Sequence, residues 1–182
     1  MTAEARWCLI GGLAVATRTE PRFTKDLDLA VDTDNDQASE QLIFTLQAAG
    51  YRVLAILEQQ VTGRLATVRL APPNMQEPVI LDLLFASSGI ESEVVQRAEV
   101  IEVFPQVRVP VACLGDLIAM KVLARDDRAR PQDRLDLKVL LQQAGPADLQ
   151  IARQALQEIA DLGYARERFL LGELALAQGE FL

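Results

Sequence analysis

The first half of the chain consists of short apolar segments separated by polar turns, a pattern that predicts a small mixed β-sheet with flanking helices. Residues 26–31 alternate acidic and apolar side chains, as a strand with one polar face does, whereas residues 79–85 are apolar on both sides of Asp82, as in a strand buried on both faces. The predicted strands cover residues 6–10, 26–31, 51–57, 62–70, 79–85 and 100–104, and the predicted helices cover residues 13–19, 34–49 and 89–97.

From Cys113 onward the apolar residues recur at helical spacing. Prolines favour the first turn of a helix and glycines favour its end, so helices are predicted at residues 113–127, 131–144, 146–163 and up to about 178. We therefore expect an α/β (α+β) fold, with a core domain at residues 1–110 followed by a helical C-terminal region at residues 111–182.

Three aspartates in the predicted strands indicate a metal site. Asp26 and Asp28 stand one residue apart, so a strand directs both carboxylates to one face, where they repel each other unless a cation lies between them. Asp82 interrupts an apolar strand, where an ionised carboxylate is costly unless it is paired or coordinates a metal. If the two strands are neighbours, the three carboxylates converge in a way that suits Mg²⁺. The alternative is that these aspartates are solvated strand ends beside turns.

Two further features are compatible with phosphate binding. Gly11 and Gly12 lie between a predicted strand and a predicted helix, where backbone N–H groups favour an anion and the lack of side chains allows close approach; the alternative is an ordinary tight turn. Lys121 lies on the apolar stripe of its predicted helix, so it either faces a cleft or extends to solvent from the edge of the stripe.

These motifs together resemble a known family. Residues 9–14 (Leu-Ile-Gly-Gly-Leu-Ala) and 22–29 (Arg-Phe-Thr-Lys-Asp-Leu-Asp-Leu) are similar to the signature of the polymerase-beta-type nucleotidyltransferases, in the form of the AbiEii/AbiGii-like toxin branch. Lys121 and residues 128–137 are similar to later Lys and Arg/Asp motifs of that branch, so the resemblance spans roughly residues 7–141.

The resemblance implies a nucleotidyltransferase fold and a Mg²⁺-dependent transfer of a nucleoside monophosphate from an NTP to an acceptor hydroxyl. Asp26 and Asp28 would bind two metal ions, Mg²⁺ or Mn²⁺, and Asp82 would complete the site and help deprotonate the acceptor. Lys121 would contact the triphosphate. The other nucleotide-binding candidates are Gly11, Gly12, Arg22, Thr24, Arg128 and Asp133.

Several of these candidates have equally simple structural interpretations. Arg22 and Thr24 fit a surface arginine and a threonine that bonds the local backbone, and Arg128 and Arg130 fit a solvated helix face. Asp133 and Asp136 suit the first turns of a helix through its dipole, although the resemblance indicates Asp133 as the functional one.

Composition narrows the chemistry. The chain has 182 residues and no histidine, which excludes a His-based zinc site, a Ser-His-Asp triad and a histidine base. A formal net charge of −8 argues against a broadly basic nucleic-acid surface but leaves room for a local cationic path over residues 121–138. Cys8 and Cys113 have no CxxC spacing and are interpreted as reduced core thiols. The sequence shows neither an apolar run of membrane-spanning length nor a signal peptide, so we expect a cytoplasmic protein.

The function expected from the sequence is that of an AbiEii-like toxin in a toxin–antitoxin or phage-defence system. Its partners would be an NTP, a tRNA end or protein hydroxyl as acceptor, and a cognate antitoxin, with no membrane. Two alternatives stay open: a nucleotidyltransferase-fold protein that acts only as a regulatory or binding module, and a small-molecule modifier such as an antibiotic nucleotidyltransferase.

Overall fold

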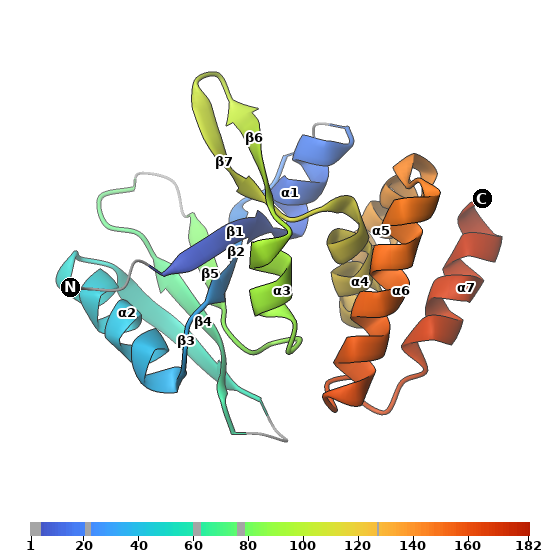
Figure 1. Ribbon diagram of the computed structural model, residues 1–182. Coiled ribbons are helices and arrows are strands. Elements are labelled where there is room, and N and C mark those ends of the chain that lie inside the picture. Colours follow the sequence, from blue (N-terminus) through green and yellow to red (C-terminus); the bar gives the residue numbers. More distant parts are fainter. Residues whose placement is uncertain (1–4, 21–22, 60–62, 76–78, 127) are drawn as a thin grey trace.

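A computed structural model describes residues 5–20, 23–59, 63–75, 79–126 and 128–182 (Figure 1). Within these ranges it contains seven strands and seven helices. The strands are β1 (Arg6–Ile10), β2 (Asp26–Asp32), β3 (Arg52–Glu58), β4 (Leu65–Ala71), β5 (Ile80–Leu84), β6 (Glu99–Phe104) and β7 (Val107–Val111). The helices are α1 (Gly11–Arg18), α2 (Asp36–Ala48), α3 (Glu91–Gln96), α4 (Leu114–Ala124), α5 (Pro131–Gln143), α6 (Pro146–Asp161) and α7 (Leu170–Phe181).

The strands form one mixed sheet in the order β3-β4-β5-β2-β1-β7-β6. The neighbours β2 and β5 are parallel, as are β1 and β7, and the remaining pairs are antiparallel. The chain therefore crosses over between β2 and β5, and the helix α2 and the hairpin β3–β4 fill that crossover. This crossover brings two strands from distant parts of the sequence side by side at the centre of the sheet.

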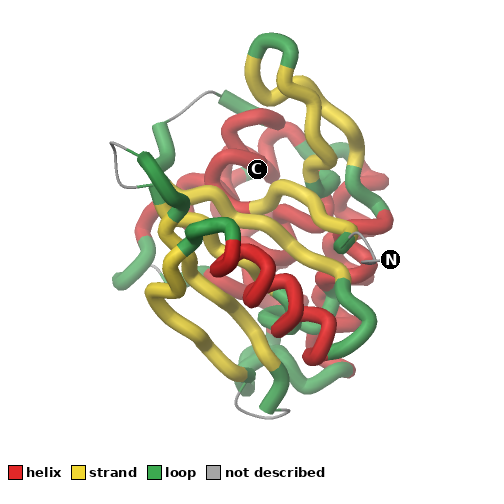
Figure 2. Tube along the Cα trace, turned by 90° about the vertical axis from the view of Figure 1, so that its left-hand side faces the viewer, coloured by secondary structure: helices red, strands yellow, loops and turns green. Residues whose placement is uncertain are grey.

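The two faces of the central strands have different neighbours. Val31 of β2, Val68 of β4 and Leu83 of β5 form a cluster with Ile43 of α2, so α2 covers this face. Figure 2 shows α2 in front of the sheet and other helices behind it. Because successive side chains of a strand alternate in direction, the residues between these apolar positions point to the opposite face.

That opposite face borders the main core. A single cluster joins buried residues of β1, α1 and α3 with those of the C-terminal helices α4 to α7. Arg97, directly after α3, donates two hydrogen bonds to the buried Asp116 of α4, with distances of 3.0 and 2.8 Å. In Figure 1 the helices α4 to α7 stand together beside the sheet. The C-terminal helices are thus packed directly onto the sheet half of the molecule.

The mixed α/β class with a helical C-terminal part, predicted from the sequence, is confirmed. One strand was missed: β7 pairs with β6 in a hairpin that extends from the sheet in Figure 1. Its sequence, Val-Arg-Val-Pro-Val, alternates as a strand does but is short and contains Pro110, and a proline argues against a strand. The helix α1 also begins at Gly11 instead of at residue 13, which places both glycines in its first turn.

Cys8 and Cys113 are free and buried, as predicted. Burial is the main cause that raises the pKa of Cys8 to about 12 and the pKa of Cys113 to about 11. Both side chains are therefore neutral thiols of the core at physiological pH. No helix in the described ranges combines the length and apolar character needed to cross a lipid bilayer.

Gly115→Ala is expected to destabilise the protein by about 1–3 kcal/mol, because a Cβ at this position would lie 2.5 Å from the backbone oxygen of Asp148 and would force α4 and α6 apart. Gly179→Ala on α7 is the matched control, since a Cβ there meets open space and a helical alanine is preferred by up to about 1 kcal/mol. Urea unfolding of both variants measures the difference. Equal stability of the two variants would show that the α4–α6 contact is looser than described.

Candidate functional site

The register of β2 and β5 brings two of the predicted site residues together. Asp28 of β2 pairs with Asp82 of β5, so the two side chains lie next to each other on the same face of the sheet. Asp26 lies two residues before Asp28 on that face, opposite Ile80 of β5. Val68, Leu83 and their neighbours occupy the other face with α2, which leaves the carboxylate face turned toward the main core.

The surroundings of Asp28 raise the pKa of its carboxyl group. Burial, followed by the negative charge of Asp82, raises its pKa to about 6, and Asp26 adds to the increase. The positive charge of Lys121 and a hydrogen bond from the Gly12 backbone N–H partly oppose this effect. Asp28 therefore carries a negative charge at neutral pH that its surroundings only partly compensate.

Gly11 makes this position of Asp28 sterically accessible. A Cβ at Gly11 would lie 1.9 Å from the Asp28 Oδ2 atom, and the backbone of Gly11 has a φ of +65°, which side chains rarely allow. Any other residue at position 11 would displace the carboxylate. Gly11 thus leaves the space that the Asp28 carboxylate occupies, and the Gly12 backbone N–H donates a hydrogen bond to it.

Asp82 has a cationic partner that the sequence did not reveal. Arg69 of β4 pairs with Asp82 in the antiparallel register and donates two hydrogen bonds, of 2.8 and 2.7 Å, to its two carboxylate oxygens. Asp82 is buried, whereas the Arg69 side chain is about half exposed (46 %). The hydrogen bonds to Asp82 raise the pKa of Arg69 above its usual value. The sequence contained one indication of this partner, because Arg69 is the single charged residue among residues 65–71.

Asp28 and Asp82 can be examined for their fit to a divalent cation, because their carboxylates are adjacent. Over the ranges that the structure describes, no three or more His, Cys, Asp or Glu side chains gather as a formed metal site. The donor chemistry fits Mg²⁺, since the adjacent groups are carboxylates and the charge of Asp28 is incompletely balanced. Arg69 supplies the positive charge at Asp82 in this structure.

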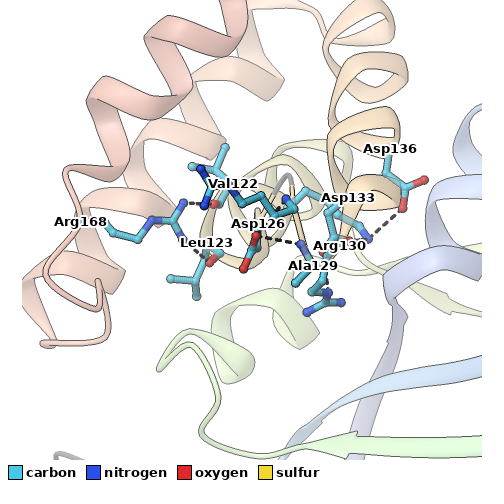
Figure 3. Close-up of polar contacts among 10 residues, drawn as sticks. Val122, Leu123, Asp126, Ala129, Arg130, Asp133, Asp136 and Arg168 are labelled. Carbon is cyan, nitrogen blue, oxygen red and sulfur yellow. Dashed lines mark hydrogen bonds and ion pairs between the residues drawn. The ribbon is translucent and has the colours of Figure 1, made fainter.

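Lys121 belongs to a buried ionic cluster between α4 and α5. Its Nζ atom lies 2.5 Å from an Asp133 oxygen and 2.8 Å from an Asp136 oxygen, and all three residues are buried. Arg130 forms an ion pair of 2.8 Å with Asp133. Figure 3 shows Arg130, Asp133 and Asp136 grouped at the start of α5. Both aspartates therefore have a structural task beyond favouring the helix dipole.

A cavity of about 150 Å³ joins the two halves of the site. Asp28 and Gly11 line it from the sheet, and Lys121 and Arg130 line it from the helical side. Its remaining lining residues are Ile10, Leu84, Ser87, Ser88, Leu117, Met120, Leu123, Ala124 and Arg166. The structure thus brings Lys121 to the same cavity as Asp28, in agreement with the influence of Lys121 on the pKa of Asp28.

The loop of Ser87 and Ser88 is held by a buried carboxylate. Glu91 accepts hydrogen bonds of 2.7–2.9 Å from the backbone N–H groups of Ser87, Ser88 and Gly89 and from the Ser88 hydroxyl. This fixes the wall of the cavity that follows β5. Ordinary serines after a strand gave no sign of this role in the sequence.

The other predicted nucleotide-binding residues lie elsewhere. Thr24 donates a long hydrogen bond of 3.4 Å to the backbone oxygen of Asp26, the local contact considered as its alternative. Thr24 and Asp26 line a separate groove of about 710 Å³, whose walls are mainly apolar. Arg128 is exposed between α4 and α5 and does not line the cavity. Arg22 is outside the residues that the structure describes.

Asp28→Asn is expected to stabilise the metal-free protein at neutral pH. The folded pKa of about 6 exceeds the unfolded value of about 3.9, so folding favours the protonated form, and stability is lost as the pH rises from about 4 to about 6. A neutral amide removes this loss, which amounts to up to about 3 kcal/mol at pH 7.5.

Urea unfolding at pH 4 and pH 7.5 checks this, and Asp161→Asn, which replaces an exposed carboxylate at the end of α6, serves as the control. The stability gain of the Asp28 variant should be large at pH 7.5 and small at pH 4. A gain that does not depend on pH would contradict the electrostatic explanation.

Three solved structures are similar to this chain at low sequence identity. A structure of a proposed nucleotidyltransferase from H. pylori is 20 % identical, with 98 % of this chain and 85 % of that chain covered and a TM-score of 0.48. The structure of JHP933 from Helicobacter pylori is 16 % identical, with 98 % and 86 % covered and a TM-score of 0.43. The solution structure of the antibiotic-resistance factor ANT(2'')-Ia is 15 % identical, with 97 % and 82 % covered and a TM-score of 0.43. A search of curated proteins found no match.

The family model described as "Nucleotidyl transferase AbiEii toxin, Type IV TA system" matches residues 2–180. This match includes both the carboxylate strands and the helices that carry Lys121 and Asp133. The chain therefore belongs to the AbiEii family of nucleotidyltransferase toxins of type IV toxin–antitoxin systems.

Proposed function

We propose that this protein transfers a nucleoside monophosphate from an NTP to an acceptor hydroxyl in a reaction that depends on Mg²⁺. The observation that carries the proposal is the register of β2 and β5, which sets the carboxylates of Asp28 and Asp82 side by side on the face that borders the cavity with Lys121. Such a pair of carboxylates beside an anion-accepting turn and a cation suits phosphoryl transfer, where catalysis consists mainly of positioning and electrostatic stabilisation.

Asp28 and Asp82 are the adjacent carboxylates that would hold Mg²⁺. Asp26, the third predicted ligand, lies on the same face but is exposed and lines the separate groove, and no group of three such ligands gathers in the described residues. When bound, the metal would supply positive charge that neutralises the phosphate groups of the NTP. Gly11 leaves room for the Asp28 carboxylate because it has no side chain, and the N-terminus of α1, which begins at Gly11, would favour an anion. In this proposal Asp82 also helps to deprotonate the acceptor hydroxyl.

Lys121 would place a positive charge on the helical wall of the cavity. Its ion pairs with Asp133 and Asp136 fix the Nζ atom, and they also compensate much of its charge. Removing Lys121 would take its positive charge away from two buried carboxylates, of which Asp133 would keep its ion pair with Arg130. Loss of one partner costs about 3–5 kcal/mol in comparable buried pairs. A Lys121 variant would therefore change the stability of the fold and the catalytic activity together, so Asp28 is the better position for a test.

The family assignment supports a toxin role with a cognate antitoxin. As acceptor we propose a macromolecule, through an RNA end or a protein hydroxyl. The groove beside Asp26 favours this over a cationic antibiotic as acceptor. Its lining contains one acidic residue, Asp26, beside Lys25 and several apolar side chains such as Phe23 and Phe104. A site for an aminoglycoside-like cation would require more negative charge.

A two-step experiment tests the proposed function. Binding of each of the four NTPs is measured by calorimetry with and without Mg²⁺, and each α-labelled NTP is then incubated with Mg²⁺ and cellular RNA or protein. The wild type is expected to bind an NTP only with Mg²⁺ and to transfer label. Asp28→Asn is expected to reduce transfer by at least about 100-fold while remaining folded.

Asp161→Asn is the matched control, because Asp161 is an exposed carboxylate at the end of α6, remote in sequence from the carboxylate strands. It should transfer label like the wild type. NTP binding without label transfer to any acceptor would support the regulatory alternative. The absence of Mg²⁺-dependent NTP binding would contradict the proposal as a whole.

A further inference from the structure

The cavity has three cationic lining residues, and they differ in how their charges are compensated. Lys121 pairs with Asp133 and Asp136, and Arg130 pairs with Asp133. Within the described ranges, no hydrogen bond or ion pair joins the Arg166 guanidinium to another residue, although Arg166 lines the same cavity. Because Arg166 is exposed overall, it lies where the cavity opens to solvent.

The loop that carries Arg166 is fixed at two points. On one side, the buried Tyr164 packs so closely on Gly89 that a Cβ there would lie 2.9 Å from its ring. On the other side, Arg168 donates hydrogen bonds of 2.9 and 2.7 Å to the backbone oxygens of Val122 and Leu123 at the end of α4 (Figure 3). Arg168 also pairs with Glu173 of α7.

Between these anchors the backbone adopts an unusual conformation. Arg166 and Glu167 have φ angles of +55° and +59°, in the left-handed region that residues with side chains rarely enter. Such strain persists only where the surrounding contacts enforce it, and here Tyr164 and Arg168 do so. The result is that the Arg166 side chain is directed to the cavity that Asp28 lines from the opposite half of the molecule.

The charges around Arg166 are those of a site for an anion. Partial burial, then the positive charges of Arg168 and Arg130, lower the pKa of Arg166 from its usual value. The Arg166 guanidinium remains charged near these cations and has no carboxylate partner in the described residues. It is therefore suited to bind phosphate oxygens through two parallel hydrogen bonds.

We propose that Arg166 binds the phosphate groups of the NTP from the helical side of the cavity, facing the carboxylates of β2 and β5. This inference rests on the proposed function and adds a phosphate-binding residue from the loop between α6 and α7. Lys121 and Arg130 are held by Asp133 and Asp136, so Arg166 is the cation of the cavity wall that remains available to the ligand.

The test measures binding by calorimetry for the wild type, Arg166→Ala and Arg166→Lys. The probes, all with Mg²⁺, are the NTP that the wild type binds most tightly, the corresponding nucleoside, and inorganic tripolyphosphate. Arg166→Ala is expected to weaken binding of the NTP and of tripolyphosphate by roughly 10- to 100-fold and to leave nucleoside binding unchanged. Arg166→Lys should lose less, because it keeps the charge but not the two parallel donors.

Arg153→Ala is the matched control, since Arg153 is an exposed arginine of α6 that does not line the cavity. It should bind all three probes within about twofold of the wild type, and thermal unfolding of the Arg166 variants should match the wild type. If the wild type binds the NTP and Arg166→Ala binds it equally well, the role of Arg166 is wrong while the proposed function stands. Equal losses for the NTP and the nucleoside would also overturn the role. If the wild type binds neither the NTP nor tripolyphosphate, both proposals are wrong.

Discussion

The pairing of β2 with β5 is the constraint on which the candidate site depends. Parallel pairing in this register places Asp28 beside Asp82, partly removed from water, so that the two negative charges repel each other. The protein reduces this cost with Arg69 at Asp82, and with Lys121 and the Gly12 N–H at Asp28. The pKa of Asp28 nevertheless remains raised, because burial and the charge of Asp82 outweigh these compensating contacts.

The helical half of the molecule supplies the opposite wall of the site. α4 and α5 are held together by Lys121, Asp133 and Asp136, and this buried cluster faces the cavity that Asp28 lines. The bond from Arg97 to Asp116 and the contact of Tyr164 with Gly89 link the sheet half to the helices. Neither half alone forms the cavity, and the family match at residues 2–180 includes both halves.

The sequence predicted most helices and strands because the spacing of apolar residues that distinguishes a strand from a helix is visible within a few neighbouring residues. They also placed Asp26 and Asp28 on one face and Asp82 in a buried strand, as the structure has them. The pairing of Arg69 with Asp82 depends on register between strands, and the direction of Arg166 depends on two left-handed residues fixed by distant anchors. The strand β7 was not predicted because it is short and contains Pro110. Contacts of this kind arise from tertiary packing, which a single sequence does not display.

The most direct test of the account is a crystal structure of the protein with Mn²⁺ and a non-hydrolysable NTP, in which the anomalous signal locates the metal. The account predicts Mn²⁺ at Asp28 and Asp82, with the triphosphate in the cavity next to Lys121. Mn²⁺ bound away from these carboxylates, or a triphosphate on the α2 side of the sheet, would contradict it.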